Sequence, residues 1–164
     1  GVSIATTSLP TMTEHEITGQ KSRLASLMQR NIIKVLLVSI PAVIFIVFFN
    51  ELAINLLYGH GYFNEASIKQ TSQVFTWLGL SLIFISIIPV INAGLYALRA
   101  YRAVFYITIG MTLVGVFLAW LFLQWLGLIG IAISTPLAAL VNVIAIIYVL
   151  QKSGVKLFLI KGQN

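Results

Sequence analysis

The segment Val35–Phe49, with the sequence VLLVSIPAVIFIVFF, decides the fold: twelve of its fifteen residues are Val, Ile, Leu or Phe. At the centre of a helix each of these favours bilayer insertion by roughly 0.3 to 0.6 kcal/mol, so the segment gains about 5 kcal/mol on insertion. The apolar character continues past Glu51 to about Tyr58. Because ~20 residues suffice to cross a bilayer as a helix, the sequence predicts a transmembrane helix here.

Three later segments have the same character, from about Val74 to Leu98, Val104 to Trp125 and Leu128 to Leu150. None shows the alternation typical of the ~10-residue strands of a membrane barrel. A helix satisfies its own backbone hydrogen bonds in lipid, whereas an open strand does not. The predicted fold class is therefore all-α: a polytopic transmembrane bundle with four full spans and the end of a fifth.

The composition of the whole chain agrees. Of 164 residues, 59% are hydrophobic and 9% are charged, against about 25% charged in an ordinary soluble domain. A soluble fold of this size could not bury so much apolar surface, which excludes a cytosolic enzyme and a disordered chain. The chain has no Cys, which excludes disulfides and thiolate metal sites. No nucleic-acid motif accompanies the excess of basic residues, so we expect no nucleic-acid partner.

The first ten residues, Gly1 to Pro10, are helix-like but too short to span a bilayer. We therefore interpret the chain as a fragment that begins in the end of a transmembrane helix. The expected organisation is a helix end over 1–11, a cytoplasmic amphipathic linker over 12–31 that runs as a helix into the first span, transmembrane helices over 32–58, 74–98, 104–126 and 127–150, a periplasmic loop over 59–73, a cytoplasmic loop over 99–103 and a basic cytoplasmic tail over 151–164.

The distribution of basic residues assigns an orientation. Four spans place residues 11–34, the 98–103 loop and the C-terminal tail on one side, and that side holds nine of the ten basic residues. The opposite side holds only Lys69. Since Lys and Arg are retained in cytoplasmic loops, the basic side is predicted to be cytoplasmic.

No residue pattern supports catalysis or a metal site, and no cofactor is expected; the two histidines lie in loops on opposite sides of the membrane. Four residues are candidates for a substrate path: Arg99, Arg102, Glu51 and Asn92. The arginines could meet a lipid phosphate or could simply fix the topology. Glu51 could bind a cation or stand in interfacial water, and Asn92 could line a polar path or bond between helices.

Four strings resemble the MviN/MurJ lipid II flippases of the multidrug/oligosaccharidyl-lipid/polysaccharide exporter superfamily. They are Gly1 to Pro10, which ends in Leu-Pro; Glu51 to Phe63; Leu95-Tyr96-Ala97 followed by Arg102; and Leu126 to Ala132 with Asn142. They occur in the family's order and spacing. The family loop after its tenth helix usually carries Asp and Pro, where this chain has Ala100 and Val104.

The resemblance implies the end of helix eight and helices nine to twelve of a two-lobe transporter in the bacterial inner membrane. Its implied partners are a lipid-linked peptidoglycan precursor, membrane lipids and the missing N-terminal lobe of the same protein. Translocation would proceed by alternating access, with no bond made or broken. The alternatives are a polysaccharide or O-antigen-unit exporter, a cation-coupled drug exporter, or a membrane scaffold that transports nothing.

Overall fold

The computed structural model describes residues 21–58 and 65–155, and nearly all of them are helical. The helices are α2 (Lys21–Tyr58), α3 (Glu65–Ala97), α4 (Tyr101–Leu126) and α5 (Leu128–Lys152), and the described ranges contain no strand. All four are long and apolar enough to cross a membrane. The predicted all-α polytopic membrane bundle is confirmed. The expectations for residues 1–20, for the turn at 59–64 and for the tail from 156 lie outside the described residues.

Three helices begin before the predicted spans, α2 and α3 by nine or more residues and α4 by three. α2 is continuous from Lys21, so the end of the linker and the first span form one helix of 38 residues. α3 begins at Glu65 and not at residue 74. The segment from Glu65 to Gln73 is polar but holds no Gly or Pro, so nothing in it interrupts a helix. Hydropathy marks the apolar part of a helix and does not mark where its hydrogen bonding starts.

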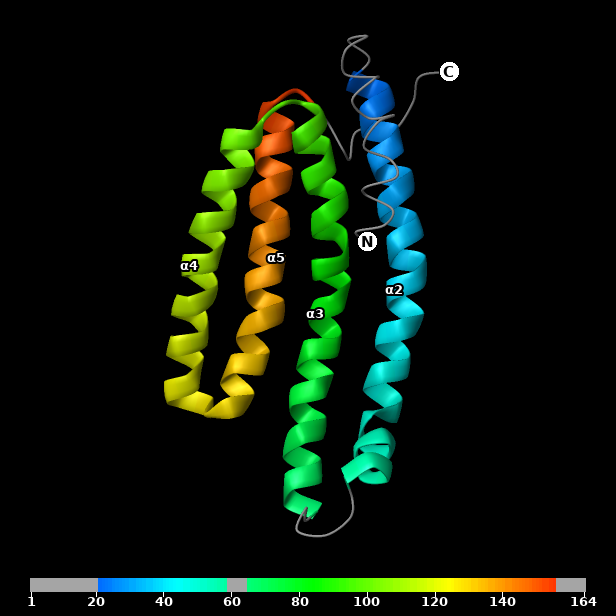
Figure 1. Ribbon diagram of the computed structural model, residues 1–164, viewed down its shortest axis with the longest axis vertical. Helices are drawn as coiled ribbons and strands as arrows, with labels where there is room; N and C mark the ends of the chain where they lie inside the picture. Colours follow the sequence, from blue (N-terminus) through cyan, green and yellow to red (C-terminus); the bar gives the residue numbers. More distant parts are fainter. Residues whose placement is uncertain (1–20, 59–64, 156–164) are drawn as a thin grey trace.

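The helices stand side by side, with α2 at one edge and α4 at the other (Figure 1). α3 packs against both α2 and α5, and α4 packs mainly against α5. α2 and α3 continue beyond the turn that joins α4 to α5, so one end of the bundle consists of these two helices alone (Figure 1). We call this the two-helix end, and the opposite end, where α3 joins α4 and α5 ends, the four-helix end.

A two-glycine turn brings α4 and α5 together. Gly127 lies between the helices with a φ of 62°, in the region that residues with a Cβ rarely adopt. A Cβ on Gly130 would collide with the backbone carbonyl of Phe122 in the last turns of α4. The two helices can therefore reverse direction at Gly127 and stay in close contact.

The best-buried side chains gather at the four-helix end. They come from α2, α3, α5 and the residue after it: Leu24, Met28, Val90, Ile91, Leu95, Ile146, Leu150 and Val155. Gly94 admits the end of the Met28 side chain, because a Cβ there would overlap the sulfur and terminal methyl of Met28. Gly79 lies close to Ile46 of α2 in the same way, whereas a Cβ on Gly110 would meet open space.

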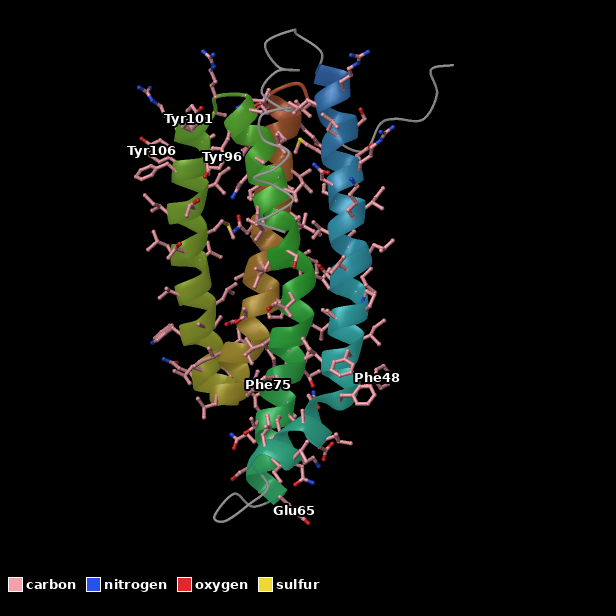
Figure 2. All side chains as sticks on the ribbon, turned by 45° about the vertical axis from the view of Figure 1, so that its right-hand side comes forward. Phe48, Glu65, Phe75, Tyr96, Tyr101 and Tyr106 are labelled. Carbon is pink, nitrogen blue, oxygen red and sulfur yellow. The ribbon has the colours of Figure 1, made fainter. Side chains whose placement is uncertain are left out.

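The outer surface of the bundle is apolar. Only Val104 of α4 is buried, and large exposed side chains of that helix include Phe105, Leu113, Phe117 and Trp125. α2 likewise exposes Leu37 and Phe45. It also exposes Phe48, which is labelled in Figure 2. Such a surface is stable against hydrocarbon and not against water, which agrees with a multi-pass membrane protein.

Candidate functional site

The charged residues of the described ranges separate between the two ends of the bundle. Arg23, Arg30 and Lys34 lie in the first half of α2, and Arg99, Arg102 and Lys152 lie around the other helix ends on the same side (Figure 1). The described acidic residues, Glu51 and Glu65, lie towards the two-helix end with Lys69. No described acid is therefore close enough to neutralise the cations of the four-helix end.

The junction between α3 and α4 holds both candidate arginines. The N–H of Ala100 donates to the Leu95 carbonyl at 2.9 Å, and the N–H of Arg99 donates to the Tyr96 carbonyl at 2.9 Å. These two bonds define a Schellman motif, in which the residue after the helix is left-handed and is usually glycine. Here that residue is Arg99, with a φ of 54°.

The end of α5 has the same motif with the usual residue. The N–H of Val155 donates to the Leu150 carbonyl at 3.2 Å, and the N–H of Gly154 donates to the Gln151 carbonyl at 3.0 Å. Gly154 has a φ of 87°. The two helix ends at one side of the bundle are thus closed alike, one by glycine and the other by Arg99.

Three tyrosines lie within a few residues of the two arginines. Tyr96 stacks on Tyr101 across the junction, with ring centroids 6.0 Å apart. All three tyrosines of the region, Tyr96, Tyr101 and Tyr106, are exposed, and Figure 2 shows them together around the start of α4. We call these tyrosines together with Arg99 and Arg102 the Arg–Tyr collar. No side-chain hydrogen bond or ion pair joins either guanidinium to another described residue.

Glu51 lies far from the collar, near the end of α2, where it is exposed. Its neighbour Asn50 is 8% exposed and faces α3. The Asn50 amide donates to the Thr76 hydroxyl at 2.6 Å and to the Ser72 carbonyl at 3.3 Å, and the Ser72 hydroxyl donates back to the Asn50 carbonyl oxygen at 2.7 Å. Asn50 therefore links α2 to α3 by side-chain hydrogen bonds.

Asn92, the fourth candidate, lies in α3 between the buried residues Ile91 and Ala93, and is itself half-buried. Other polar residues within the spans bond to their own helix: the hydroxyls of Ser134 and Thr135 both donate to the Ile131 carbonyl. The carbonyl oxygen of Asn142 is buried without a partner among the described residues.

An open hollow of about 460 Å³ separates the start of α3 from the start of α5. Ser67, Gln70 and Thr71 line its polar part, and Val74, Leu128 and Ile131 belong to its apolar part. None of the four candidate residues lines it. The hollow exists because α3 extends beyond the α4–α5 turn, so that its first turns have no helix beside them on that face.

The structure brings together Arg99 and Arg102 and leaves Glu51 and Asn92 apart from them and from each other. Sequence reasoning missed the tyrosines of the collar. Their spacing of five residues, at positions 96, 101 and 106 around a short basic loop, was the available signal. It also missed the Asn50–Ser72–Thr76 cluster, because its members lie on different helices.

Known proteins resemble this chain along most of its length. The family model described as "Lipid II flippase MurJ" matches residues 1–162. The curated "Probable lipid II flippase MurJ" of Borreliella burgdorferi is 25% identical over 98% of the chain. Proteins of the same name from Treponema pallidum and Thermotoga maritima are 29% and 24% identical over 58% and 82% of the chain.

These relatives are much longer than the chain. The matched region makes up 32% of the Borreliella burgdorferi protein, 18% of the Treponema pallidum protein and 28% of the Thermotoga maritima protein. The chain thus spans about a third or less of the length of the curated relatives it matches.

Proposed function

Because the chain belongs to the lipid II flippase MurJ family, we propose that it forms part of a transporter that moves lipid II across the bacterial inner membrane. Lipid II is the undecaprenyl-diphosphate-linked precursor of peptidoglycan, so the process served is cell-wall synthesis and the maintenance of cell shape. The observation that carries the proposal is the family match over residues 1–162, on a chain whose described part consists of four apolar helices. Transport makes and breaks no bond, and the proposed role is not enzymatic.

The proposed orientation places the four-helix end in the cytoplasm and the two-helix end in the periplasm. All described cations except Lys69 lie in the half of the bundle that ends at the α3–α4 junction. Basic residues near the ends of spans are retained on the cytoplasmic side. In this orientation α2 and α4 run from the cytoplasm outward, and α3 and α5 run back.

The chain would act as one lobe that moves against the remainder of the protein in alternating access. α2 and α3 are joined at both ends, by the buried apolar side chains around Met28 and Leu95 and by the Asn50 cluster. This double attachment supports motion of the pair as one body. The diphosphate of lipid II needs cationic partners in the cavity, which the rest of the protein would supply.

Depletion of the protein in its own cells tests this function. An external lipid II hydrolase that cannot cross the membrane reaches only lipid II that has been moved to the outer leaflet. We expect depletion to raise total lipid II and to lower the fraction that is cleaved, and restored expression to reverse both changes. An unchanged cleaved fraction would contradict the proposal and favour export of another lipid-linked sugar, of a drug, or a scaffold role.

A further inference from the structure

We propose that the Arg–Tyr collar binds the headgroup of an anionic phospholipid, with the phosphate on Arg99 and Arg102 and the acyl chains along the apolar surface of α4. This binding concerns the membrane around the protein and does not depend on which molecule the protein transports. It requires only that the helices span a bilayer.

The two guanidinium groups are available for a phosphate. Both arginines are exposed, and neither side chain bonds to another described residue. A guanidinium presents parallel N–H donors that match two oxygens of one phosphate, and such charged hydrogen bonds are about twice as strong as neutral ones. No described acid lies at this end of the bundle to compete for them.

The left-handed backbone of Arg99 costs conformational free energy relative to glycine at the same position. A residue with a Cβ in the left-handed region is less stable than glycine, and the equivalent position at the end of α5 is Gly154. No side-chain hydrogen bond or ion pair to a described residue offsets this cost at Arg99. A bound anion would offset it.

The spacing of aromatic residues along α4 places the collar at the membrane surface. Tyr106 and Trp125 are both exposed and lie 19 positions apart on this helix, which is about 28 Å at 1.5 Å per residue. The hydrocarbon core of a bilayer is about 30 Å thick, and Tyr and Trp concentrate at its two boundaries. Arg99 and Arg102 precede Tyr106 by one to two turns, so they reach the level of the lipid phosphates.

The charge of the collar selects the kind of lipid. Two cations with no nearby described acid attract a net negative headgroup such as phosphatidylglycerol. A zwitterionic headgroup brings its own cation close to the arginines and gains less. Below the phosphate, exposed Phe105 and Tyr106 offer aromatic surface, with ring centroids 5.7 Å apart, to the glycerol and the first methylenes.

Native mass spectrometry of the purified chain in a neutral detergent tests this binding, with phosphatidylglycerol and phosphatidylcholine added in turn. The wild-type chain should bind phosphatidylglycerol more tightly. At ~1 kcal/mol for each basic residue near an anionic lipid, the double variant R99Q/R102Q should lose about 30-fold of that preference. The matched control is R23Q/R30Q, which removes the same charge from α2 at the same end and should keep the preference.

A second variant covers the case in which R99Q/R102Q fails to fold. R99K/R102K keeps both charges but loses the paired donors, and we expect it to keep only part of the preference. Equal losses in R99Q/R102Q and R23Q/R30Q would show general attraction to a positive surface and would overturn the proposal. Tighter binding of undecaprenyl diphosphate than of phosphatidylglycerol at the collar would also overturn it, and would place this loop in the substrate path.

Discussion

The two ends of the bundle are held together in different ways. At the four-helix end, fully buried apolar side chains from α2, α3 and α5 contact one another. The basic residues of this end have no described acidic residue near them. At the two-helix end, α2 meets only α3, and hydrogen bonds of Asn50 with Ser72 and Thr76 join them. The core of the protein is thus displaced towards the side that we propose is cytoplasmic.

This difference assigns different roles to the ends. Apolar packing among α2, α3 and α5 is hard to open, because any separation leaves cavities in several contacts at once. A few hydrogen bonds between two helices cost less to break, since an interhelical bond in a membrane contributes only about 0.6 kcal/mol on average. When the chain is destabilised, separation of α2 from α3 should therefore begin at the two-helix end, and the four-helix end should open last.

The largest expected effect concerns which end faces the cytoplasm. The chain has no Cys, so an introduced cysteine is its only thiol and any labelling comes from that position. We expect A66C, on exposed Ala66 of the two-helix end, to react in intact cells with a thiol reagent that cannot cross the membrane. Q151C at the four-helix end should react only after the cells are opened. The reverse pattern would invert the proposed orientation.

A second prediction tests the apolar core. Leu95 is fully buried at the four-helix end, and L95A should cost about 3 kcal/mol by loss of packing and creation of a cavity. For a chain of this size that lowers the thermal unfolding midpoint in detergent by about 6 to 12 °C. The matched control is L56A in α2, where Leu56 is 71% exposed, and its midpoint should stay within about 2 °C of wild type. Similar losses in both variants would remove the contrast between the ends.

The helices could be predicted from the sequence because their signal is local. The apolar run from Val35 to about Tyr58 is long enough to cross a bilayer whatever it packs against. The start of α3 at Glu65 could not be located in this way, because hydropathy does not detect helical turns made of polar residues. The position of the core near the four-helix end could not be predicted either, because residues that face lipid and residues that face another helix are equally apolar.

The candidate site could be predicted only in part. Arg99 and Arg102 stand in a loop of a few residues, so their proximity follows from the sequence. The left-handed backbone of Arg99 does not, because that position is ordinarily glycine. The Asn50 cluster joins residues that are 22 and 26 positions apart on different helices, and one sequence contains no information on that pairing.

The third prediction tests the hydrogen bonds of the two-helix end. N50A removes the amide and leaves the Ser72 hydroxyl without its acceptor, so we expect a loss of about 1 to 2 kcal/mol. The control is N55A, five residues further along α2, where Asn55 is exposed. Thermal unfolding in detergent measures the loss, and N55A should stay close to wild type. Unchanged stability in N50A would mean that the cluster does not hold α2 to α3.

The smallest expected effect compares the two Schellman motifs of the four-helix end. Arg99 and Gly154 occupy the same left-handed position, with φ values of 54° and 87°. A Cβ at such a position costs roughly 1 kcal/mol or somewhat more relative to glycine. G154A should therefore lower the free energy of unfolding by about 1 kcal/mol, and R99G should raise it by a similar amount in a detergent without anionic lipid.

The same R99G substitution removes one guanidinium from the Arg–Tyr collar, so its two effects should have opposite signs. Without lipid, the unfolding midpoint of R99G should be about 2 to 4 °C higher than that of wild type. Added phosphatidylglycerol should raise the midpoint of R99G less than it raises the midpoint of wild type. If Arg99 were merely structural, R99G would change the unfolding midpoint of the lipid-free chain. The rise in midpoint on adding phosphatidylglycerol would then be the same as in wild type. A fall in both would mean that Arg99 stabilises the junction directly, and the two helix ends would then differ in more than the residue that closes them.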